Sequence, residues 1–287
     1  MDIEKLKYEA KNKALLIADV NGSALFNADC MDILPLIPDK SVQLILADLP
    51  YGTTACKWDS IIPLEPLWKE YKRIIKDNGA IVLTASQPFT TKLISSNYEM
   101  FKYCWVWNKA KAANFQQVKY APLKIHEDIC VFSKTRHFYN PQMTNGKERQ
   151  KGGYKVKGEF AVMDGAPAVV NDVYYPKSIL DYSLSDKKNS GLHPTQKHVG
   201  LFEYLIRTYT NEGDIVLDNT MGSGTCPLAS AILNRRFIGI EKEEKYYNIA
   251  VNRLKEQKYG YSTEDNRRHT INNTIYDSLR RKLFIRI

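Results

Sequence analysis

The chain has 287 residues and carries 41 Lys and Arg against 32 Asp and Glu, which gives a formal net charge of +9. Its hydrophobic fraction of 44% and charged fraction of 25% are those of an ordinary globular protein, and they argue against disordered, collagen-like and coiled-coil chains. The length suits one large α/β domain, or one domain with an insertion.

Membrane, secretory and disulfide classes are also disfavoured. No apolar run approaches the roughly 18 residues that cross a bilayer, and the first residues lack the apolar segment of a secretory signal. The five cysteines are odd in number, widely spaced and never in Cys-x-x-Cys, which argues against a disulfide framework or a zinc site. We therefore expect a cytoplasmic protein with no membrane contact and no metal.

Short apolar runs that end at polar or turn residues predict the strands of a parallel α/β sheet. Between the first two runs, apolar residues recur at helical spacing from Leu64 to Lys76, and Asn78-Gly79 is expected to close this helix. Further helices are expected at 201–207 and from Tyr246 to Lys255. The predicted strands, all expected to be central and buried, are 42–47, 80–84, 129–132, 215–217 and 237–240.

An alternating aromatic pattern lies between the second and third of these strands. Phe101, Tyr103, Trp105 and Trp107 alternate with other residues, so one face of a strand would be wholly aromatic. We expect this face to pack in the core.

The surplus charge is concentrated in one part of the chain. Residues 101–158 carry twelve Lys or Arg against three acids, so the rest of the chain is neutral overall. From about Lys134 to Leu192, Gly and Pro punctuate a polar, basic stretch without sustained periodicity, which indicates an insertion. A basic segment of this kind is typical of a polyanion-binding protein, although a solvated lysine-rich face is about as well supported by charge alone.

Asp48-Leu49-Pro50-Tyr51-Gly52 follows the first predicted strand, at the carboxyl end where open parallel sheets place their ligands. A carboxylate, a proline-held backbone and an aromatic ring can hold a planar amine by hydrogen bonds while stacking on its ring. A strand followed by a plain Pro-Tyr turn is the alternative.

A glycine loop, Asp218-Asn219-Thr220-Met221-Gly222-Ser223-Gly224-Thr225, follows the strand at 215–217. Its two glycines let the backbone approach a ligand closely, and Thr225 leads toward a helix whose amino end favours an anion. Pro227 stands where a dinucleotide-binding fingerprint needs a third glycine, which weakens the interpretation of the chain as a hydride-transfer enzyme. Glu241 lies at the end of the next strand, the position at which nucleoside-binding α/β folds usually place the acidic acceptor of the ribose hydroxyls. The alternative is a surface glutamate in an acidic run.

Four motifs together resemble a known family. Asp48-Leu49-Pro50-Tyr51 resembles the Asp-Pro-Pro-Tyr motif of S-adenosylmethionine-dependent amino-methyltransferases that modify DNA bases, and Gly222-Ser223-Gly224-Thr225 resembles their cofactor loop. His193-Pro194-Thr195-Gln196-Lys197 and Asn27-Ala28-Asp29-Cys30 are similar to two further motifs of the family. The order, with the catalytic motif before a basic insertion and the cofactor loop after it, is that of the β class.

The resemblance implies a Rossmann-like, mostly parallel methyltransferase sheet with helices on both faces and an inserted basic target-recognition region. Residues 1–133 would form the catalytic-motif half of the methyltransferase domain, and residues 134–192 the target-recognition insertion. Residues 193–258 would form the cofactor-binding half, and 259–287 a C-terminal extension.

The resemblance also implies roles for the catalytic residues Asp48, Leu49, Pro50 and Tyr51. Asp48 and the carbonyl of Leu49 would accept hydrogen bonds from the exocyclic amine of the target base, and Tyr51 would stack on the flipped base. No covalent intermediate is needed, and the sequence lacks the Pro-Cys nucleophile of cytosine-C5 enzymes. Leu49 replaces the first proline of the motif but keeps the carbonyl that the chemistry uses.

For S-adenosylmethionine, Gly222 and Gly224 would pass the methionine part, and Glu241 would hold the ribose. Asp29 would meet the adenine, and Thr195 with Lys197 would reach the methionine carboxylate. A helix cap is the alternative role of Thr195, and Thr220 lacks the aromatic ring that the family more often has in this loop. The full predicted cofactor set is Asp29, Cys30, Asp48, Thr195, Lys197, Asp218, Gly222, Ser223, Gly224, Thr225 and Glu241.

The predicted function is methylation of the N6 amine of adenine in DNA, since Asp rather than Ser at position 48 favours adenine in this family. N4-cytosine methylation and a nucleic-acid-binding module that has lost catalysis are the alternatives, and a homodimer and a separate restriction nuclease are partners that the resemblance leaves open. Asn114, Phe115 and His126-Glu127 are expected to shape the base pocket. The predicted DNA-binding residues are Lys147, Arg149, Lys151, Lys155 and Lys157.

Overall fold

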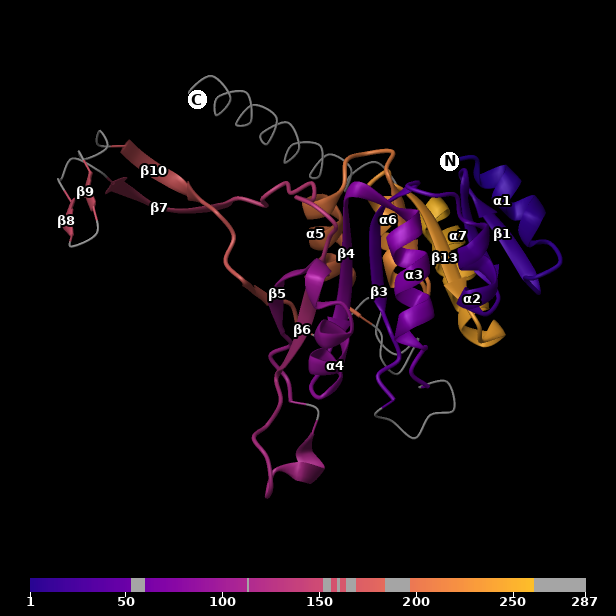
Figure 1. Ribbon diagram of the computed structural model, residues 1–287, viewed down its shortest axis with the longest axis horizontal. Helices are drawn as coiled ribbons and strands as arrows, with labels where there is room; N and C mark the ends of the chain where they lie inside the picture. The colour runs from indigo at the N-terminus through magenta and orange to yellow at the C-terminus, as the bar shows by residue number, and fades with distance from the viewer. Residues whose placement is uncertain are drawn as a thin grey trace.

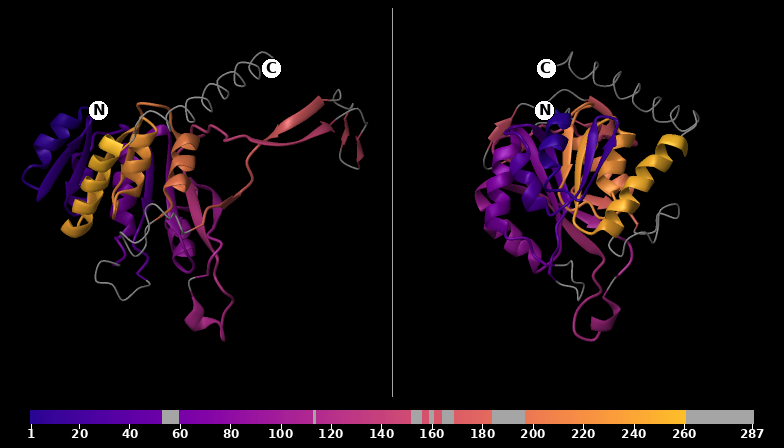
Figure 2. Two further views of the ribbon diagram at one scale, coloured as in Figure 1. Left: turned by 180° about the vertical axis from the view of Figure 1, so that it is seen from behind. Right: turned by 90° about the vertical axis from the view of Figure 1, so that its right-hand side faces the viewer.

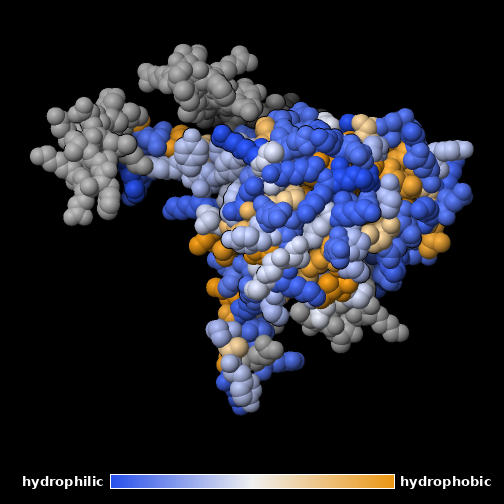
Figure 3. Space-filling model, in the orientation of Figure 1, coloured by the Kyte–Doolittle hydropathy of each residue, from blue (hydrophilic) through white to orange (hydrophobic). Residues whose placement is uncertain are grey.

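The computed structural model of the chain describes residues 1–52, 60–112, 114–151, 156–158, 161–163, 169–183 and 197–260. They form a large sheet with helices against it and an arm that extends to one side (Figure 1). The surface in this view is mostly hydrophilic, with separate hydrophobic patches (Figure 3). None of the helices in the described ranges is long and apolar enough to span a bilayer.

The main sheet has nine strands in the order β1-β2-β13-β12-β3-β4-β6-β5-β11. Seven of these strands run in the same direction, whereas β1 and β6 run the opposite way. The predicted fold class is confirmed, and all five predicted central strands lie inside the sheet. The strands are β1 (Leu16–Val20), β2 (Ser23–Asn27), β3 (Val42–Asp48), β4 (Ile75–Ala85), β5 (Phe101–Asn108), β6 (His126–Phe132), β11 (Ile179–Asp181), β12 (Ile215–Asp218) and β13 (Arg236–Glu241).

Helices cover both faces of this sheet, α1 to α4 on one side and α5 to α7 on the other (Figure 2). Along β3, Ile45 packs with the first group and Leu44 and Leu46 pack with the second, because successive side chains of a strand point to opposite faces. The helices are α1 (Ile3–Ala10), α2 (Cys30–Ile33), α3 (Leu64–Ile74), α4 (Phe89–Ser96), α5 (Val199–Tyr209), α6 (Thr225–Ile232) and α7 (Glu244–Gly260), with single turns η1 (Leu34–Leu36), η2 (Tyr98–Met100) and η3 (Phe115–Gln117).

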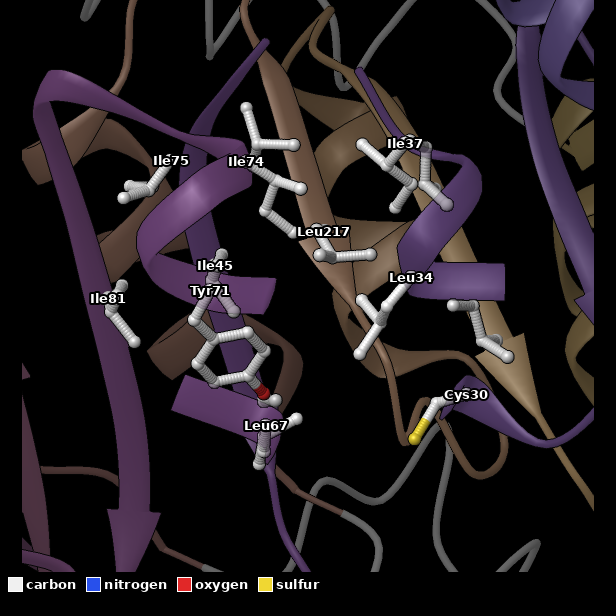
Figure 4. Packing of buried hydrophobic residues seen from close by; sticks show 14 of the residues in the cluster. Cys30, Leu34, Ile37, Ile45, Leu67, Tyr71, Ile74, Ile75, Ile81 and Leu217 are labelled. Carbon is white, nitrogen blue, oxygen red and sulfur yellow. The ribbon is translucent and has the colours of Figure 1, made fainter. Parts of the chain in front are cut away.

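The first half of the core lies under α3. Leu67, Tyr71 and Ile74 of this helix point toward Ile45 and Leu217 of the sheet (Figure 4). All five side chains are at most 1% exposed, so the apolar face that the helical spacing predicts is the face that is buried.

The predicted end of this helix is wrong by two residues. The helix ends at Ile74, and Ile75 already pairs with Val42 as the first residue of β4. Both isoleucines are fully buried, so the extended backbone after Ile74 keeps two adjacent apolar residues in the core. Asn78-Gly79 therefore lies within β4, where a Cβ on Gly79 would stand 2.9 Å from the carbonyl oxygen of Gln43.

The aromatic strand is confirmed as β5, with one exception in its faces. Tyr103, Trp105 and Trp107 pack with the core on the side of α5 to α7. Phe101 packs with the opposite core, because the pairing of β5 with β6 shifts register between Phe101 and Tyr103. Such an irregularity changes the face to which the next side chain points.

The arm is an antiparallel ribbon of β7 (Thr144–Lys151) and β10 (Val169–Tyr174), with the short pair β8 (Val156–Gly158) and β9 (Ala161–Met163) farther out (Figure 1). It lies in the basic stretch for which the sequence shows no sustained periodicity. After the arm, β11 joins the main sheet beside β5, so the stretch 134–192 also supplies an edge strand of the main sheet.

Gly224 is required by the packing of α6 against α7. Its φ is +80°, and a Cβ there would lie 2.7 Å from the Cβ of Ala250. We expect Gly224→Ala to lower the free energy of unfolding by about 2–4 kcal/mol, because backbone strain and a steric clash add. Gly22→Ala is the matched control: its φ is +73° with nothing within 4 Å, so only about 1 kcal/mol is expected in urea unfolding. Equal losses would show that the contact with Ala250 is unimportant.

Candidate active site

The carboxyl ends of the parallel strands meet at one edge of the sheet. β3 is followed along the chain by β4 on one side, whereas β12 is followed by β13 on the other, so the order of strands reverses between β12 and β3. Open α/β sheets bind ligands outside such a point. Asp48 ends β3, Asp218 ends β12 and Glu241 ends β13. The fold thus brings together two motifs that lie about 170 residues apart in the sequence.

Every acceptor oxygen of Asp48 has a donor. The hydroxyl of Tyr51 donates to Asp48 Oδ1 at 2.8 Å, and the hydroxyl of Thr84 donates to the same oxygen. Lys197 Nζ lies 2.6 Å from Asp48 Oδ2. If Lys197 moves, only Oδ2 loses its partner, because the hydroxyls of Tyr51 and Thr84 still hold the carboxylate through Oδ1.

Tyr51 is held inside the site. Its ring stacks on Phe89 with centroids 5.2 Å apart and an angle of 25° between the planes. Burial, with the charges of Asp48 and Glu127, raises the pKa of Tyr51 well above its usual value, so its hydroxyl remains a donor. The predicted stacking of Tyr51 on a base stays a prediction, as does the role of the Leu49 carbonyl.

Lys197 belongs to a chain of four charges. Its ammonium pairs with Asp48 and lies 3.6 Å from Glu127 Oε2, and Lys109 Nζ lies 2.9 Å from Glu127 Oε1. Burial by itself would lower the pKa of Lys197, but the charges of Asp48 and Glu127 outweigh it and raise the pKa. Burial would likewise raise the pKa of Glu127, yet the charges of Lys197, Lys109 and Lys124 lower it. Both groups are therefore held in their charged forms.

Glu241 supports the glycine loop. Its Oε2 accepts the N–H of Gly222 at 2.8 Å, and its Oε1 accepts the N–H of Glu243 at 2.8 Å. Burial raises the pKa of Glu241 against the lowering effect of these hydrogen bonds. Burial also raises the pKa of Asp218 well above its usual value.

Thr220 connects the two motifs directly. Its hydroxyl donates to the carbonyl oxygen of Asp48 at 3.1 Å, and its N–H donates to Asp218 Oδ1 at 3.1 Å. The small polar residue that stands in this loop instead of an aromatic ring therefore ties the glycine loop to β3. Beside it, Asn219 Oδ1 accepts the hydroxyl of Tyr71 at 2.5 Å.

The remaining described residues of the predicted cofactor set lie in the glycine loop and at the start of α2, and most of them are buried. Ser223, Thr225 and Cys30 are at most 7% exposed, and the carbonyl oxygen of Ser223 accepts a hydrogen bond from Arg253 of α7 at 2.6 Å. Asp29 caps α2 through a 3.0 Å hydrogen bond from Met31 N and pairs with Lys242 at 3.0 Å. These residues lie at the same sheet edge, where the side chains of Ser223 and Asp29 already have structural partners.

Of the predicted DNA-binding residues, Lys147 and Arg149 lie on the arm, away from this edge (Figure 1). Lys147 and Arg149 are exposed and two positions apart on β7, so they share a face of the ribbon. Arg149 lies over the ring of Tyr174 at 6.0 Å. The side chains of Lys151 and Lys157, together with Lys155, His193 and Thr195, lie outside the described part of the chain.

Three residues at this edge were not predicted from the sequence: Thr84, Lys109 and Phe89. Thr84 ends the predicted strand 80–84 next to the strand of Asp48, and the two residues pair directly in the register. The rule that neighbouring parallel strands end at one edge could have found it. Lys109 and Phe89 carry no comparable signal, because their positions depend on the packing of a loop and of α4.

Comparisons with known proteins agree with this geometry. The sequence model of the DNA methylase family of N6 and N4 methyltransferases matches residues 42–252. The chain belongs to this DNA methylase family. The match begins with β3, ends within α7 and includes both motifs at the sheet edge.

Individual relatives cover most of the chain. The type II methyltransferase M.HpaI of Haemophilus parainfluenzae is 28% identical over 276 residues, which are 91% of this chain and 83% of that protein. The crystal structure of the M1.HpyAVI–SAM complex superposes with a TM-score of 0.56 and 25% identity, over 80% of this chain and 98% of that one. The cytosine-N4-specific PvuII DNA methyltransferase shares the fold, with a TM-score of 0.59 and 16% identity over 80% of this chain and 85% of that one.

Proposed function

We propose that this DNA methylase transfers the methyl group of S-adenosylmethionine to the N6 amine of adenine in DNA. The observation that carries the proposal is the Asp48 carboxylate at the end of β3, fixed by Tyr51 and Thr84 and tied through Thr220 to the glycine loop. A positioned acceptor beside a cofactor loop is what transfer to an amine requires.

The residues at the edge fit S-adenosylmethionine, the cofactor of the family. Glu241 offers acceptors for ribose hydroxyls, and Asp48 and Asp218 place two further carboxyl groups at the ends of the neighbouring strands. The buried Nδ2 of Asn219 has no hydrogen-bond partner in the described part of the chain other than the weakly accepting sulfur of Cys30, so it keeps the capacity to donate to a ligand. The bound cofactor supplies an activated methyl group.

The protein's part in the reaction is positioning. Asp48 Oδ2 and the Leu49 carbonyl accept hydrogen bonds from the two N–H groups of the amine and aim its lone pair at the methyl group. Positive charge develops on the amine nitrogen, and the Asp48 carboxylate stabilises it. For this, Lys197 must give up Asp48 Oδ2, and Glu127 Oε2 lies 3.6 Å away as an alternative partner.

The preference for adenine rests on Asp48, because aspartate at this position favours adenine in the family. The fold does not decide between the bases, since a cytosine-N4-specific enzyme shares it. The test is incubation with unmethylated genomic DNA and methyl-labelled S-adenosylmethionine, followed by mass spectrometry of the nucleosides. We expect labelled N6-methyladenine, whereas N4-methylcytosine would overturn the assignment. Cofactor binding without transfer to DNA would support a binding module.

We further propose that the arm recognises DNA. Its exposed Lys147 and Arg149 share one face of β7, which suits contacts to successive phosphates or base edges. In this proposal residues 134–192 form the target-recognition insertion between the catalytic-motif half, 1–133, and the cofactor-binding half, 193–258. Cytoplasmic location, a homodimer, a separate restriction nuclease and the extension 259–287 stay predictions.

Cofactor affinity is expected to depend on the protonation of Glu241. Because burial raises the pKa of Glu241 above 4.5, the group gains a proton earlier than an exposed glutamate as the pH falls. Affinity for S-adenosylmethionine should therefore be full above the raised pKa and fall as the pH is lowered through it. Calorimetric titration measures the effect, and Glu241→Gln should bind weakly with a flat profile. A wild-type profile as flat as that of Glu241→Gln would contradict this role.

A further inference from the structure

A loop at the active-site edge carries five exposed large hydrophobic residues. Residues 109–125, here called the edge loop, follow β5 and extend beyond the carboxyl ends of the strands, downward in Figure 1. Phe115, Val118 and Tyr120 of this loop are 66%, 56% and 91% exposed, and Leu123 and Ile125 are also exposed. Exposed residues of this kind, gathered in one protruding segment, indicate a binding surface.

The edge loop is closed at its neck by hydrogen bonds. The side chain of Asn114 donates to the carbonyl oxygen of Pro122 at 3.0 Å and accepts the N–H of Lys124 at 2.7 Å. Asn114 therefore shapes this neck. The predicted pocket role of Phe115 stays a prediction; its side chain is 66% exposed.

The neck is also attached to the catalytic edge. Lys124 Nζ contacts the hydroxyl of Ser86 and lies 3.4 Å from the carbonyl oxygen of Gln87. Ser86 directly follows β4, whose Thr84 donates to Asp48. The neck of the edge loop is thus anchored at Ser86, two residues after Thr84, whose hydroxyl donates to the catalytic carboxylate of Asp48.

The charge of the edge loop indicates what it contacts. It carries Lys109, Lys111, Lys119 and Lys124 and no acidic residue, but Lys109 is buried and pairs with Glu127, so it is not part of an exposed rim. Lys111 and Lys119 are exposed on either side of Phe115 in the sequence. A positively charged rim around an apolar, aromatic tip is complementary to duplex DNA, which offers phosphates outside and stacked bases inside.

We propose that the tip of the edge loop enters the DNA at the target base pair, where Phe115 and Tyr120 fill the space that the flipped base leaves. This inference rests on the proposed function, because an enzyme acting on an amine inside a duplex must extrude the base. The side chain of Asp48 is only 21% exposed, so a base cannot reach it while stacked. Apolar side chains inserted between bases compensate for lost stacking.

The test compares the double variant Phe115→Ala/Tyr120→Ala with the wild type on two forms of one DNA. Labelled methyl transfer is measured on unmethylated genomic duplex and on the same DNA after heat denaturation to single strands. We expect the double variant to lose about tenfold or more of its rate on duplex and to keep its rate on single strands, where no base has to be flipped. Tyr98→Ala is the matched control, because Tyr98 is 73% exposed and precedes the opposite end of β5.

A second readout follows base flipping itself. Once the sites methylated by the wild type are mapped, 2-aminopurine replaces the target base in a short duplex, and its fluorescence rises when it leaves the stack. The wild type and Tyr98→Ala should give this rise, and the double variant should lose most of it. Melting temperature and affinity for S-adenosylmethionine should be unchanged; if the double variant does not fold, Tyr120→Ala alone is tested, since its ring is 91% exposed.

The possible results separate the inference from the function on which it rests. A double variant that keeps both its duplex rate and its fluorescence signal overturns the insertion of the edge loop. An equal loss on duplex and single strands also overturns it, because the aromatic rings would then act on the target base itself. A wild-type protein that methylates no DNA of either form contradicts the proposed function instead.

Discussion

Asp48→Asn is expected to lower kcat for DNA methylation by about 10²–10³-fold. The substitution keeps the size of the side chain and a carbonyl oxygen for the hydroxyls of Tyr51 and Thr84, but it removes the negative charge that faces the amine. Charge stabilisation of a nitrogen that becomes positive in the transition state is therefore lost. Single-turnover methyl transfer from labelled S-adenosylmethionine measures the change.

Affinity for the cofactor should change much less than kcat in this variant, because Glu241 and the glycine loop are untouched. Asp77→Asn is the matched control: Asp77 is an exposed aspartate near the start of β4 that pairs with Lys40, at the other end of the strand from Thr84. It should leave kcat unchanged. An Asp48→Asn enzyme within tenfold of the wild type would show that another group accepts the amine.

The sequence predicts the strands and the edge well because those signals are local. Buried runs such as 42–47, in which Gln43 is the single polar residue, and 215–217 are almost wholly apolar, and each is followed at once by the polar residues of the site. Since parallel strands end at one edge, Asp48, Asp218 and Glu241 could be placed together without coordinates.

Other features depend on contacts that are distant in the sequence. β7 and β10 pair across a stretch rich in Gly and polar residues, where neither strand has the alternating pattern that marks a buried face. The pairing of Lys197 with Asp48 joins residues 149 positions apart, and family resemblance assigns Lys197 to the cofactor instead. The shift of Phe101 to the other face follows from a register irregularity that no local pattern reveals.

The two assignments of Lys197 are compatible if its partner changes on cofactor binding. The ammonium of Lys197 pairs with Asp48 and lies near Glu127, so it reduces the repulsion between these two carboxylates. A ligand carboxylate at this place could replace Asp48 as its partner. Asp48 Oδ2 would then be free to accept the amine, so cofactor binding would prepare the site for the base.

Lys197→Met should accordingly destabilise the protein strongly, by about 3–5 kcal/mol, because it leaves Asp48 without its partner in a largely buried site. The side chains of Lys197, Asp48 and Glu127 are 9%, 21% and 14% exposed. Methionine fills a similar volume, so the loss measures the charge more than the packing. Urea unfolding followed by circular dichroism gives the value.

The control for this prediction is Lys76→Met, which removes a lysine from the 3.1 Å pair with Asp214 at the other end of the sheet. Lys76 is 37% exposed, and a partly exposed ion pair contributes only about 0–1 kcal/mol. The double variant Lys197→Met/Asp48→Asn should recover part of the lost stability, since the unpaired carboxylate is gone as well. If Lys197→Met costs no more than Lys76→Met, water reaches Asp48 freely. In that case the ion pair with Lys197 is not what holds the Asp48 carboxylate before the amine binds.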